Sequence, residues 1–318
     1  INPILGCEVY VAPNSRFDRE VGSDEDRYYH LVLLAENNQG YANLMKIVSL
    51  GFVEGFYYRP RVDKELLRQY HEGIIALSAC LAGEVPRYLT RGLYEEARQT
   101  ALEYQEIFGK DNYFLELQDH GIPDQRLVNQ QLLRMSEELH IPLVATNDVH
   151  YTYEDDVAAH DILLCIQTGK KLTDENRMRY EGGQYFVKSP EQMAELFPYA
   201  LQALENTHKI AKRCHVEIEF GVTKLPKYDV PDGYTSWEYL NKLCWEGLEE
   251  KYHPVTEELK ERLTYELNTI KTMGYVDYFL IVWDFIKYAR DNDIMVGPGR
   301  GSAAGSIVSY SLGITQLD

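Results

Sequence analysis

The sequence contains little of what would mark an exported or membrane protein. Its five cysteines among 318 residues are widely spaced and form no CxxC pair, which favours reduced thiols over a disulfide framework. No apolar run approaches the roughly 18 residues that span a bilayer. The first residues, INPILGCEVYV, lack the charged region and cleavage site of a signal peptide. We therefore expect a soluble, cytoplasmic protein with no membrane partner.

Positive charge is also scarce. The 32 Lys and Arg residues face 50 Asp and Glu residues, a formal net charge of -18. The summed field repels phosphate backbones, so composition gives no support for nucleic-acid binding, and any such contact must be local or lie outside this chain. The sequence starts without Met and enters a strand-like run at once. We therefore expect it to be a fragment of a longer polypeptide.

Short β-branched runs alternate with amphipathic stretches over the first two thirds of the chain. This alternation predicts an α/β domain built from βαβ units, with a parallel sheet or barrel. FGVTKLPKYDVPDGYTSW, which has two prolines and two glycines, predicts a boundary between domains at 1–221 and 222–318. The second domain should be mainly helical, with helices at 236–252 and 256–273, a third that includes YFLIVWDFIKYARDN, a short strand IMV and a final helix SAAGSIVSYSL.

TNDVHY is the strongest local signal for a metal. Asp148 and His150 lie two residues apart at the end of an apolar strand, so both side chains should point to one side. In α/β barrels the carboxyl ends of the strands carry the site. A solvated aspartate and a hydrogen-bonded histidine at a strand end explain this short pattern at least as well, so other ligands must converge with it.

Three further residues are candidates to converge there. Cys80 closes IIALSAC, Glu8 lies within the apolar run ILGCEVYV, and His30 opens HLVLLA. A charged Glu in a buried strand needs a partner, and a metal ion is one. Each residue alone fits an ordinary structural role, whereas together they form an O/N/S ligand set suited to zinc, or to manganese or iron if carboxylates dominate. His120, in QDHGIP, is interpreted as a loop residue.

The second candidate site is GPGRGSAAGS. A strand, a glycine-rich turn and a helix start would offer bare N–H groups and a positive helix dipole to a phosphate. Arg300 could add a charge-assisted contact, and Ser302 could act as the helix N-cap and as a phosphate ligand. Glycines at every second position match neither the P-loop nor the dinucleotide pattern. A tight turn before a closely packed helix is an equally good interpretation.

As a string, IVWDFIKYARDNDIMVGPGRGSAAGSIVSYSLGITQLD resembles the start of the palm in family C bacterial replicative DNA polymerases, the DNA polymerase III alpha subunits. GCEVYVAP, LSACLAGEVP, ELQDHGIP and VATNDVHY resemble the polymerase and histidinol phosphatase (PHP) domain that precedes that palm. The resemblance covers essentially the whole chain without an inserted exonuclease domain, as in the DnaE type. It implies a PHP-type distorted β/α barrel, truncated at its N-terminus, followed by the mainly helical start of a nucleotidyltransferase-like palm.

The resemblance also implies roles for particular residues. In the PHP domain Glu8, His30, Cys80, Asp148 and His150 match metal ligands for Zn²⁺ or Mn²⁺. The domain then either carries a 3′-5′ exonuclease activity or binds a separate proofreading subunit. In the palm, Gly301 and Ser302, with Gly299 and Arg300 beside them, match a motif that contacts the incoming nucleotide's phosphates.

The full-length protein is expected to extend a primer 3′-hydroxyl with deoxynucleoside triphosphates, using Mg²⁺, on template-primer DNA. Its partners would be a sliding clamp, a clamp-loader subunit and the proofreading exonuclease. Further PHP ligands and the palm's catalytic aspartates are expected outside this chain, which should be inactive as a polymerase by itself. The alternatives are a stand-alone, metal-dependent PHP phosphoesterase and a non-enzymatic platform for a proofreading partner.

Overall fold

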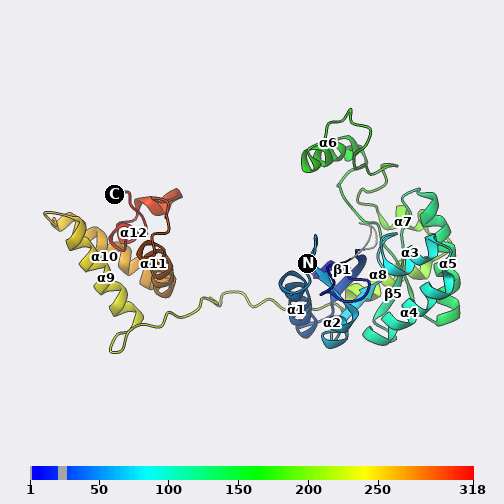
Figure 1. Cartoon of the computed structure of the whole chain (residues 1–318), viewed down its shortest axis with the longest axis horizontal. Helices are drawn as coiled ribbons and strands as arrows, with labels where there is room; N and C mark the ends of the chain where they lie inside the picture. The colour runs from blue at the N-terminus through cyan, green and yellow to red at the C-terminus, as the bar shows by residue number, and fades with distance from the viewer. Residues whose placement is uncertain (1, 21–26) are drawn as a thin grey trace. The chain divides into compact units, whose positions relative to one another are not determined.

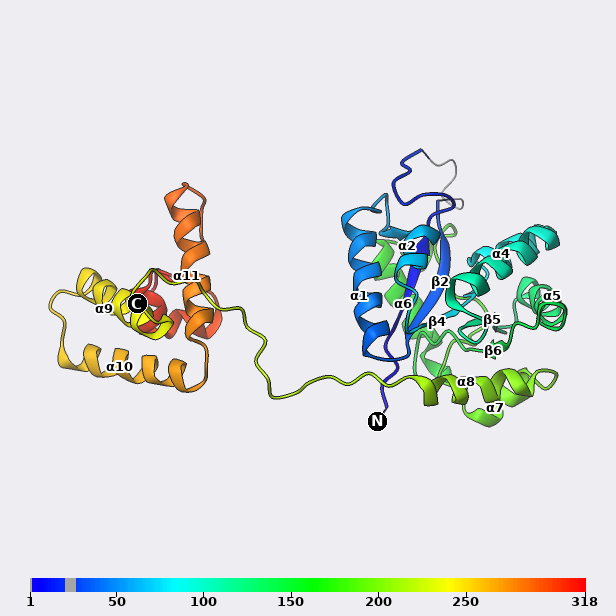
Figure 2. The same ribbon diagram turned by 90° about the horizontal axis from the view of Figure 1, so that it is seen from below.

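A computed structural model describes residues 2–20 and 27–318. The chain divides into two compact units, Ile1–Ile218 and Glu219–Asp318, which Figures 1 and 2 show in two views. The first unit is a sheet covered by helices and the second is helical. The α/β fold class expected from the sequence is confirmed. Within the described ranges, no helix is both long and apolar enough to cross a bilayer.

The first unit contains a six-stranded mixed sheet. Its strands are β1 (Gly6–Val11), β2 (Tyr29–Ala35), β3 (Arg61–Val62), β4 (Ile74–Leu77), β5 (Tyr113–Leu117) and β6 (Leu143–Ala145), in the order β3-β1-β2-β4-β5-β6. The pairs β1–β3, β4–β5 and β5–β6 are parallel, whereas β2 is antiparallel to both of its neighbours. The prediction of a parallel sheet or barrel is therefore wrong at β2 only. The described part of the β1–β2 connection contains no helix, and without a crossover helix successive strands pair antiparallel.

Helices of the first unit begin where the sequence supplies caps. Their bounds are α1 (Asn38–Val53), α2 (Lys64–Gln69), α3 (Glu84–Thr90), α4 (Tyr94–Phe108), α5 (Pro123–Leu139), the short 3₁₀ helix η2 (Glu154–Asp156), α6 (Val157–Thr168), α7 (Pro190–Leu196) and α8 (Leu201–Arg213). Asn37 and Asp63 accept backbone N–H groups at the starts of α1 and α2. Ser189 caps α7 with Pro190 at its first position, and both residue types favour the start of a helix.

Residues of β2 alternate strictly between buried and half-buried positions, so the two faces of the sheet pack differently. One face contributes Leu31 and Leu33 to the large core that the helices cover. The opposite face places Val32 and Leu34 against a smaller apolar cluster that includes Ile210 of α8. His30 lies on this second face, at the other end of the strand from Leu34, and is half-buried. Polar groups gather at that end.

The second unit consists of α9 (Ser236–Lys251), α10 (Glu257–Thr272), α11 (Val276–Asp291), the 3₁₀ helix η3 (Gly301–Gly305) and α12 (Ile307–Ser311). Its core is lined by Leu240, Cys244, Leu248, Leu263, Leu267, Leu280, Ile307, Val308 and Leu312. The helices predicted at 236–252 and 256–273 are present, with Thr235 and Thr256 as N-caps. Residues 294–296, predicted as a strand, form no strand. The predicted final helix is split into η3 and α12, and Ser306 rather than Ser302 caps the α-helix.

Gly247 of α9 lies against the backbone of α12, and a Cβ at this position would come within 2.0 Å of the Ser311 carbonyl oxygen. Because backbone cannot rotate away, we expect Gly247→Ala to lower the free energy of unfolding of this unit by about 1–3 kcal/mol. All three tryptophans lie in the unit, at positions 237, 245 and 283, so urea unfolding followed by tryptophan fluorescence measures it. Gly297→Ala is the control, since nothing lies within 4 Å of its Cβ position; equal midpoints for the two variants would contradict the prediction.

Candidate metal centre and phosphate loop

Three of the five candidate ligands converge at one end of the sheet. His30 Nδ1 lies 3.0 Å from Glu8 Oε1 and 3.6 Å from Cys80 Sγ. One ligand atom from each residue falls within 4.8 Å of the other two. The imidazole thus lies between a carboxylate and a thiol contributed by distant parts of the sequence.

Strand register brings Glu8 and His30 together. In the antiparallel β1–β2 pair, Tyr10 is opposite His30 and Glu8 is opposite Val32, so the four side chains share one face and Glu8 is diagonal to His30. Cys80 comes from the loop after β4, three residues beyond the last strand residue, Leu77. It was predicted to close the strand, and a turn at Ala79 (φ 64°) directs it instead.

The contacts of His30 control the charge of this cluster. Burial lowers the pKa of His30, but hydrogen bonds to Cys80 and Glu8 outweigh burial and raise the pKa to about 9. The hydrogen bond from His30 in turn lowers the pKa of Glu8. Without a metal ion, His30 is therefore protonated at neutral pH and paired with a carboxylate.

Asp148 and His150 lie beside this group without joining it. They follow β6, which ends at Ala145, and the Asp148 backbone adopts φ 47°. The prediction that both side chains point to one side of a strand is therefore wrong. His150 Nδ1 lies 2.8 Å from the Asp148 carbonyl oxygen and 3.9 Å from Asp148 Oδ1. The charge of His150 lowers the pKa of Glu8, which indicates that the pair lies near the cluster.

Aromatic rings that sequence patterns did not indicate surround His150. Its ring centroid is 4.3 Å from that of Tyr180, 5.6 Å from that of Tyr185 and 5.7 Å from that of His160. His120, interpreted as a loop residue, does lie in the loop after β5, but it is only 2% exposed and stacks on Tyr185 at 4.0 Å. The rings come from the segment that follows β6, which contains α6 (Figure 1).

The donor set of the cluster fits a transition metal. A carboxylate oxygen, an imidazole nitrogen and a thiolate sulfur are the ligand types that zinc binds, and manganese accepts the first two. Tetrahedral zinc with bonds of about 2.0–2.3 Å places its ligand atoms roughly 3.3–3.8 Å apart. The separations of 3.0 and 3.6 Å at His30 are close to this range. A metal would have to displace the His30 proton to bind.

The glycine-rich loop of the second unit presents an exposed surface. Gly299, Arg300, Gly301 and Ser302 are all exposed, and the two glycines adopt φ 147° and 61°. Among the described residues, none forms a hydrogen bond or an ion pair with the Arg300 side chain. Gly301 and Ser302 begin η3, so their N–H groups have no partner within that helix. The loop therefore offers N–H groups and one guanidinium to an anion.

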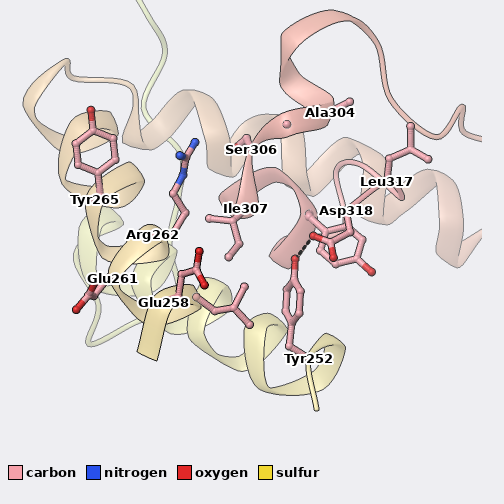
Figure 3. A pocket seen from close by; sticks show the side chains of 13 residues that line it. Tyr252, Glu258, Glu261, Arg262, Tyr265, Ala304, Ser306, Ile307, Leu317 and Asp318 are labelled. Atoms are coloured by element: carbon pink, nitrogen blue, oxygen red, sulfur yellow. Dashed lines mark hydrogen bonds between the residues drawn. The ribbon is translucent and has the colours of Figure 1, made fainter. Parts of the chain in front are cut away.

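Glu266 of α10 fixes the end of this loop. Its Oε2 accepts hydrogen bonds from Ser306 Oγ at 2.8 Å and from the Val308 N–H at 3.3 Å, while Arg262 pairs with its Oε1 at 2.7 Å. A cavity of about 610 Å³ adjoins this anchor (Figure 3). Its lining residues are Tyr252, Glu258, Leu259, Glu261, Arg262, Tyr265, Ala304, Gly305, Ser306, Ile307, Tyr310, Leu317 and Asp318. The cavity borders the end of η3, while residues 299–302 lie outside its lining.

Two family models match separate parts of the chain. Residues 1–120 match the PHP domain family, and residues 238–318 match the bacterial DNA polymerase III alpha NTPase domain. The whole chain is 50% identical to DNA polymerase III subunit alpha of Treponema pallidum and 48% identical to that of Borreliella burgdorferi. The identity to the Thermus aquaticus subunit is 37%. These matches confirm the resemblance drawn from the sequence, and the chain spans 27%, 28% and 31% of the three relatives.

The left-handed backbone at Asp148 leads to a stability prediction. An alanine at φ 47° is disfavoured by roughly 1–2 kcal/mol, whereas glycine there costs roughly 0.4–1 kcal/mol through the entropy of the unfolded chain. We therefore expect Asp148→Gly to be more stable than Asp148→Ala by about 0.5–1 kcal/mol, although both lack the carboxylate. Urea unfolding of the first unit, followed by far-ultraviolet circular dichroism, measures this difference. The reverse order would show that this backbone conformation is not retained.

Proposed function

Because the chain carries a PHP domain and a DNA polymerase III alpha NTPase domain, we propose that it works as part of a replicative DNA-directed DNA polymerase. The identity of 37–50% that extends over all of this chain is the observation that carries the proposal. The polymerase adds deoxynucleotides to a primer 3′-hydroxyl on template DNA in the cytoplasm, with Mg²⁺. Sliding clamp, clamp-loader subunit and proofreading exonuclease are its proposed partners.

Within that polymerase, the PHP unit binds Zn²⁺ or Mn²⁺ through Glu8, His30 and Cys80, with Asp148 and His150 as the further ligands. The convergence of the first three side chains supports this assignment. A bound ion of this kind polarises a phosphodiester and lowers the pKa of a bound water. The unit then serves either as a 3′-5′ exonuclease or as the docking platform of the proofreading subunit.

Gly299, Arg300, Gly301 and Ser302 bind the triphosphate of the incoming nucleotide. Support comes from the exposed guanidinium and from the N–H groups that begin η3. The sequence predicts that the dipole of a helix that starts at this loop attracts the phosphate. Because α12 has only five residues and starts at Ile307, that dipole does not contribute to phosphate binding. Recognition then depends on Arg300 and on local N–H groups.

The stand-alone phosphoesterase is the weaker alternative. It would require only the first unit, whereas residues 238–318 match a polymerase domain and the relatives align over both units. The polymerase assignment accounts for the entire chain.

The metal assignment predicts that replacing Cys80 weakens metal binding, whereas replacing Cys7, the other half-buried cysteine, does not. The chain should retain zinc or manganese after dialysis, and Cys80→Ser should weaken binding by more than the roughly 10–100-fold typical of changes outside the ligand shell. Asp148→Ala should also lower the metal content. Elemental analysis and metal titration measure both effects.

Cys7→Ser is the matched control, because Cys7 precedes Glu8 on β1 and successive strand residues point to opposite faces. Equal metal binding by the Cys80→Ser variant and the unchanged chain would remove Cys80 from the site. Loss of metal in the Cys7→Ser variant alone would refute the assignment.

The loop assignment predicts a nucleotide-binding defect. In a polymerase of the relatives' length that carries this segment, Arg300→Ala should weaken deoxynucleotide binding by roughly 1.5–3 kcal/mol, the range of a lost charge-assisted hydrogen bond. Titration with a labelled deoxynucleoside triphosphate measures the change. Arg262→Ala is the control, since Arg262 is paired with Glu266. An unchanged affinity in the Arg300→Ala variant would reduce the loop to a structural turn.

A further inference from the structure

Glu116 is a buried carboxylate that none of the proposed roles uses. It lies in β5, a strand whose other residues are apolar, and is 5% exposed. A carboxylate in such a place needs hydrogen-bond donors. The Ala79 N–H donates to its Oε2 at 2.9 Å, and the Thr146 hydroxyl and the Gln118 amide donate to its Oε1. Its oxygens are therefore occupied by groups of the protein.

The donors belong to two loops that carry candidate ligands. Ala79 immediately precedes Cys80, and Thr146 lies two residues before Asp148. Because β4, β5 and β6 are adjacent and parallel, their carboxyl ends meet at the same edge of the sheet. Glu116, from the middle strand, thus connects the loop after β4 to the loop after β6.

The β4 loop is connected to Glu116 a second time. The Glu116 N–H donates to Ser78 Oγ at 2.8 Å, while its carboxylate accepts from Ala79, the next residue. These two hydrogen bonds attach two successive loop residues, Ser78 and Ala79, to Glu116. Loosening it would free Cys80 to move away from His30.

Both loops also contain a non-glycine residue with left-handed backbone. Ala79 has φ 64° and Asp148 has φ 47°. Such conformations persist only where the surrounding structure holds them. Glu116 holds Ala79 directly and Asp148 through Thr146, so one side chain stabilises unusual backbone in both loops.

We propose that Glu116 is a positioning residue of the metal centre, which sets the placement of Cys80 relative to Asp148 without itself binding the ion. This inference rests on the proposed metal-binding function. This role goes beyond filling the core. Removing the Glu116 carboxylate should therefore change the metal affinity and the reactivity of Cys80 more than it changes the stability of the fold.

The test compares Glu116→Ala and Glu116→Gln with the unchanged chain, using Zn²⁺ alone as the probe in a competition titration. Glu116→Ala should bind Zn²⁺ roughly 10–100-fold more weakly, as outer-shell changes do. Glu116→Gln, which keeps the shape and one acceptor oxygen, should restore most of the affinity. Thr146→Val removes a single hydroxyl and should have an intermediate effect.

Asp63→Ala is the matched control for general destabilisation. Asp63 is 1% exposed and accepts hydrogen bonds from Arg16 and from the Leu66 N–H, but it lies in the loop before α2 and contacts no candidate ligand in the described ranges. It should lower stability and leave Zn²⁺ affinity unchanged. Equal Zn²⁺ affinity in the unchanged chain and in Glu116→Ala would overturn the inference.

A second measurement separates this inference from the metal proposal. In metal-free protein with Cys7 replaced by Ser, the rate at which a thiol reagent modifies Cys80 should rise in Glu116→Ala and stay unchanged in Asp63→Ala. Failure of the unchanged chain to bind Zn²⁺ would refute the metal function. The rate of thiol modification at Cys80 would then be the measurement that tests the positioning role of Glu116. An unaltered rate in Glu116→Ala would overturn the positioning role. If Glu116→Ala does not fold, Thr146→Val, which removes one donor to Glu116, is compared with Asp63→Ala in both measurements.

Discussion

The position of His30 between Glu8 and Cys80 depends on the antiparallel pairing of β2 with both of its neighbours. Residues of β2 alternate between the two faces of the sheet. One face is apolar and covered by helices, while the other is apolar near α8 and polar at the opposite end of the strand. A slip of one residue in the β1–β2 register would turn Glu8 away from His30. The buried face of the sheet therefore fixes the geometry of the cluster.

The two candidate sites are supported in different ways. The metal cluster lies on β1, on β2 and in the loop after β4, and backbone groups in the loops after β4 and β6 bond to the buried side chains Glu116 and His120. The phosphate loop is exposed, and its stable anchors are Glu266 at one end and the hydrogen bond from the Gln316 N–H to the Pro298 carbonyl at the other. The first site is suited to holding an ion in fixed geometry. The second leaves Arg300 free to reach a ligand.

Much of the arrangement could be predicted from the sequence. Glu8 was identified because a charge in an apolar strand needs a partner, and the same signal in YFLEL could have identified Glu116. A short-range pattern also indicates Ser189 as the cap of α7, whereas the last helix is capped by Ser306 and not by the predicted Ser302. The resemblance to a known family added the five candidate ligands as a set, of which three converge in the structure.

What the sequence did not predict depends on long-range geometry. The antiparallel direction of β2, the turns at Ala79 and Asp148, and the rings around His150 are set by contacts between segments far apart in the chain. The split of the last helix after Gly305 reflects the bond between Ser306 and Glu266, which no local pattern indicates. Hydrophobic alternation and residue propensities describe one helix or strand at a time, so they cannot predict contacts between segments that are distant in the sequence.

The claim that Glu8, His30 and Cys80 form a metal centre is tested most directly by X-ray absorption spectroscopy of the zinc-loaded chain. The account predicts one sulfur ligand at about 2.3 Å together with lighter ligands at about 2.0–2.1 Å, and loss of the sulfur shell in Cys80→Ser but not in Cys7→Ser. A zinc shell composed only of oxygen and nitrogen in the unchanged chain would contradict it.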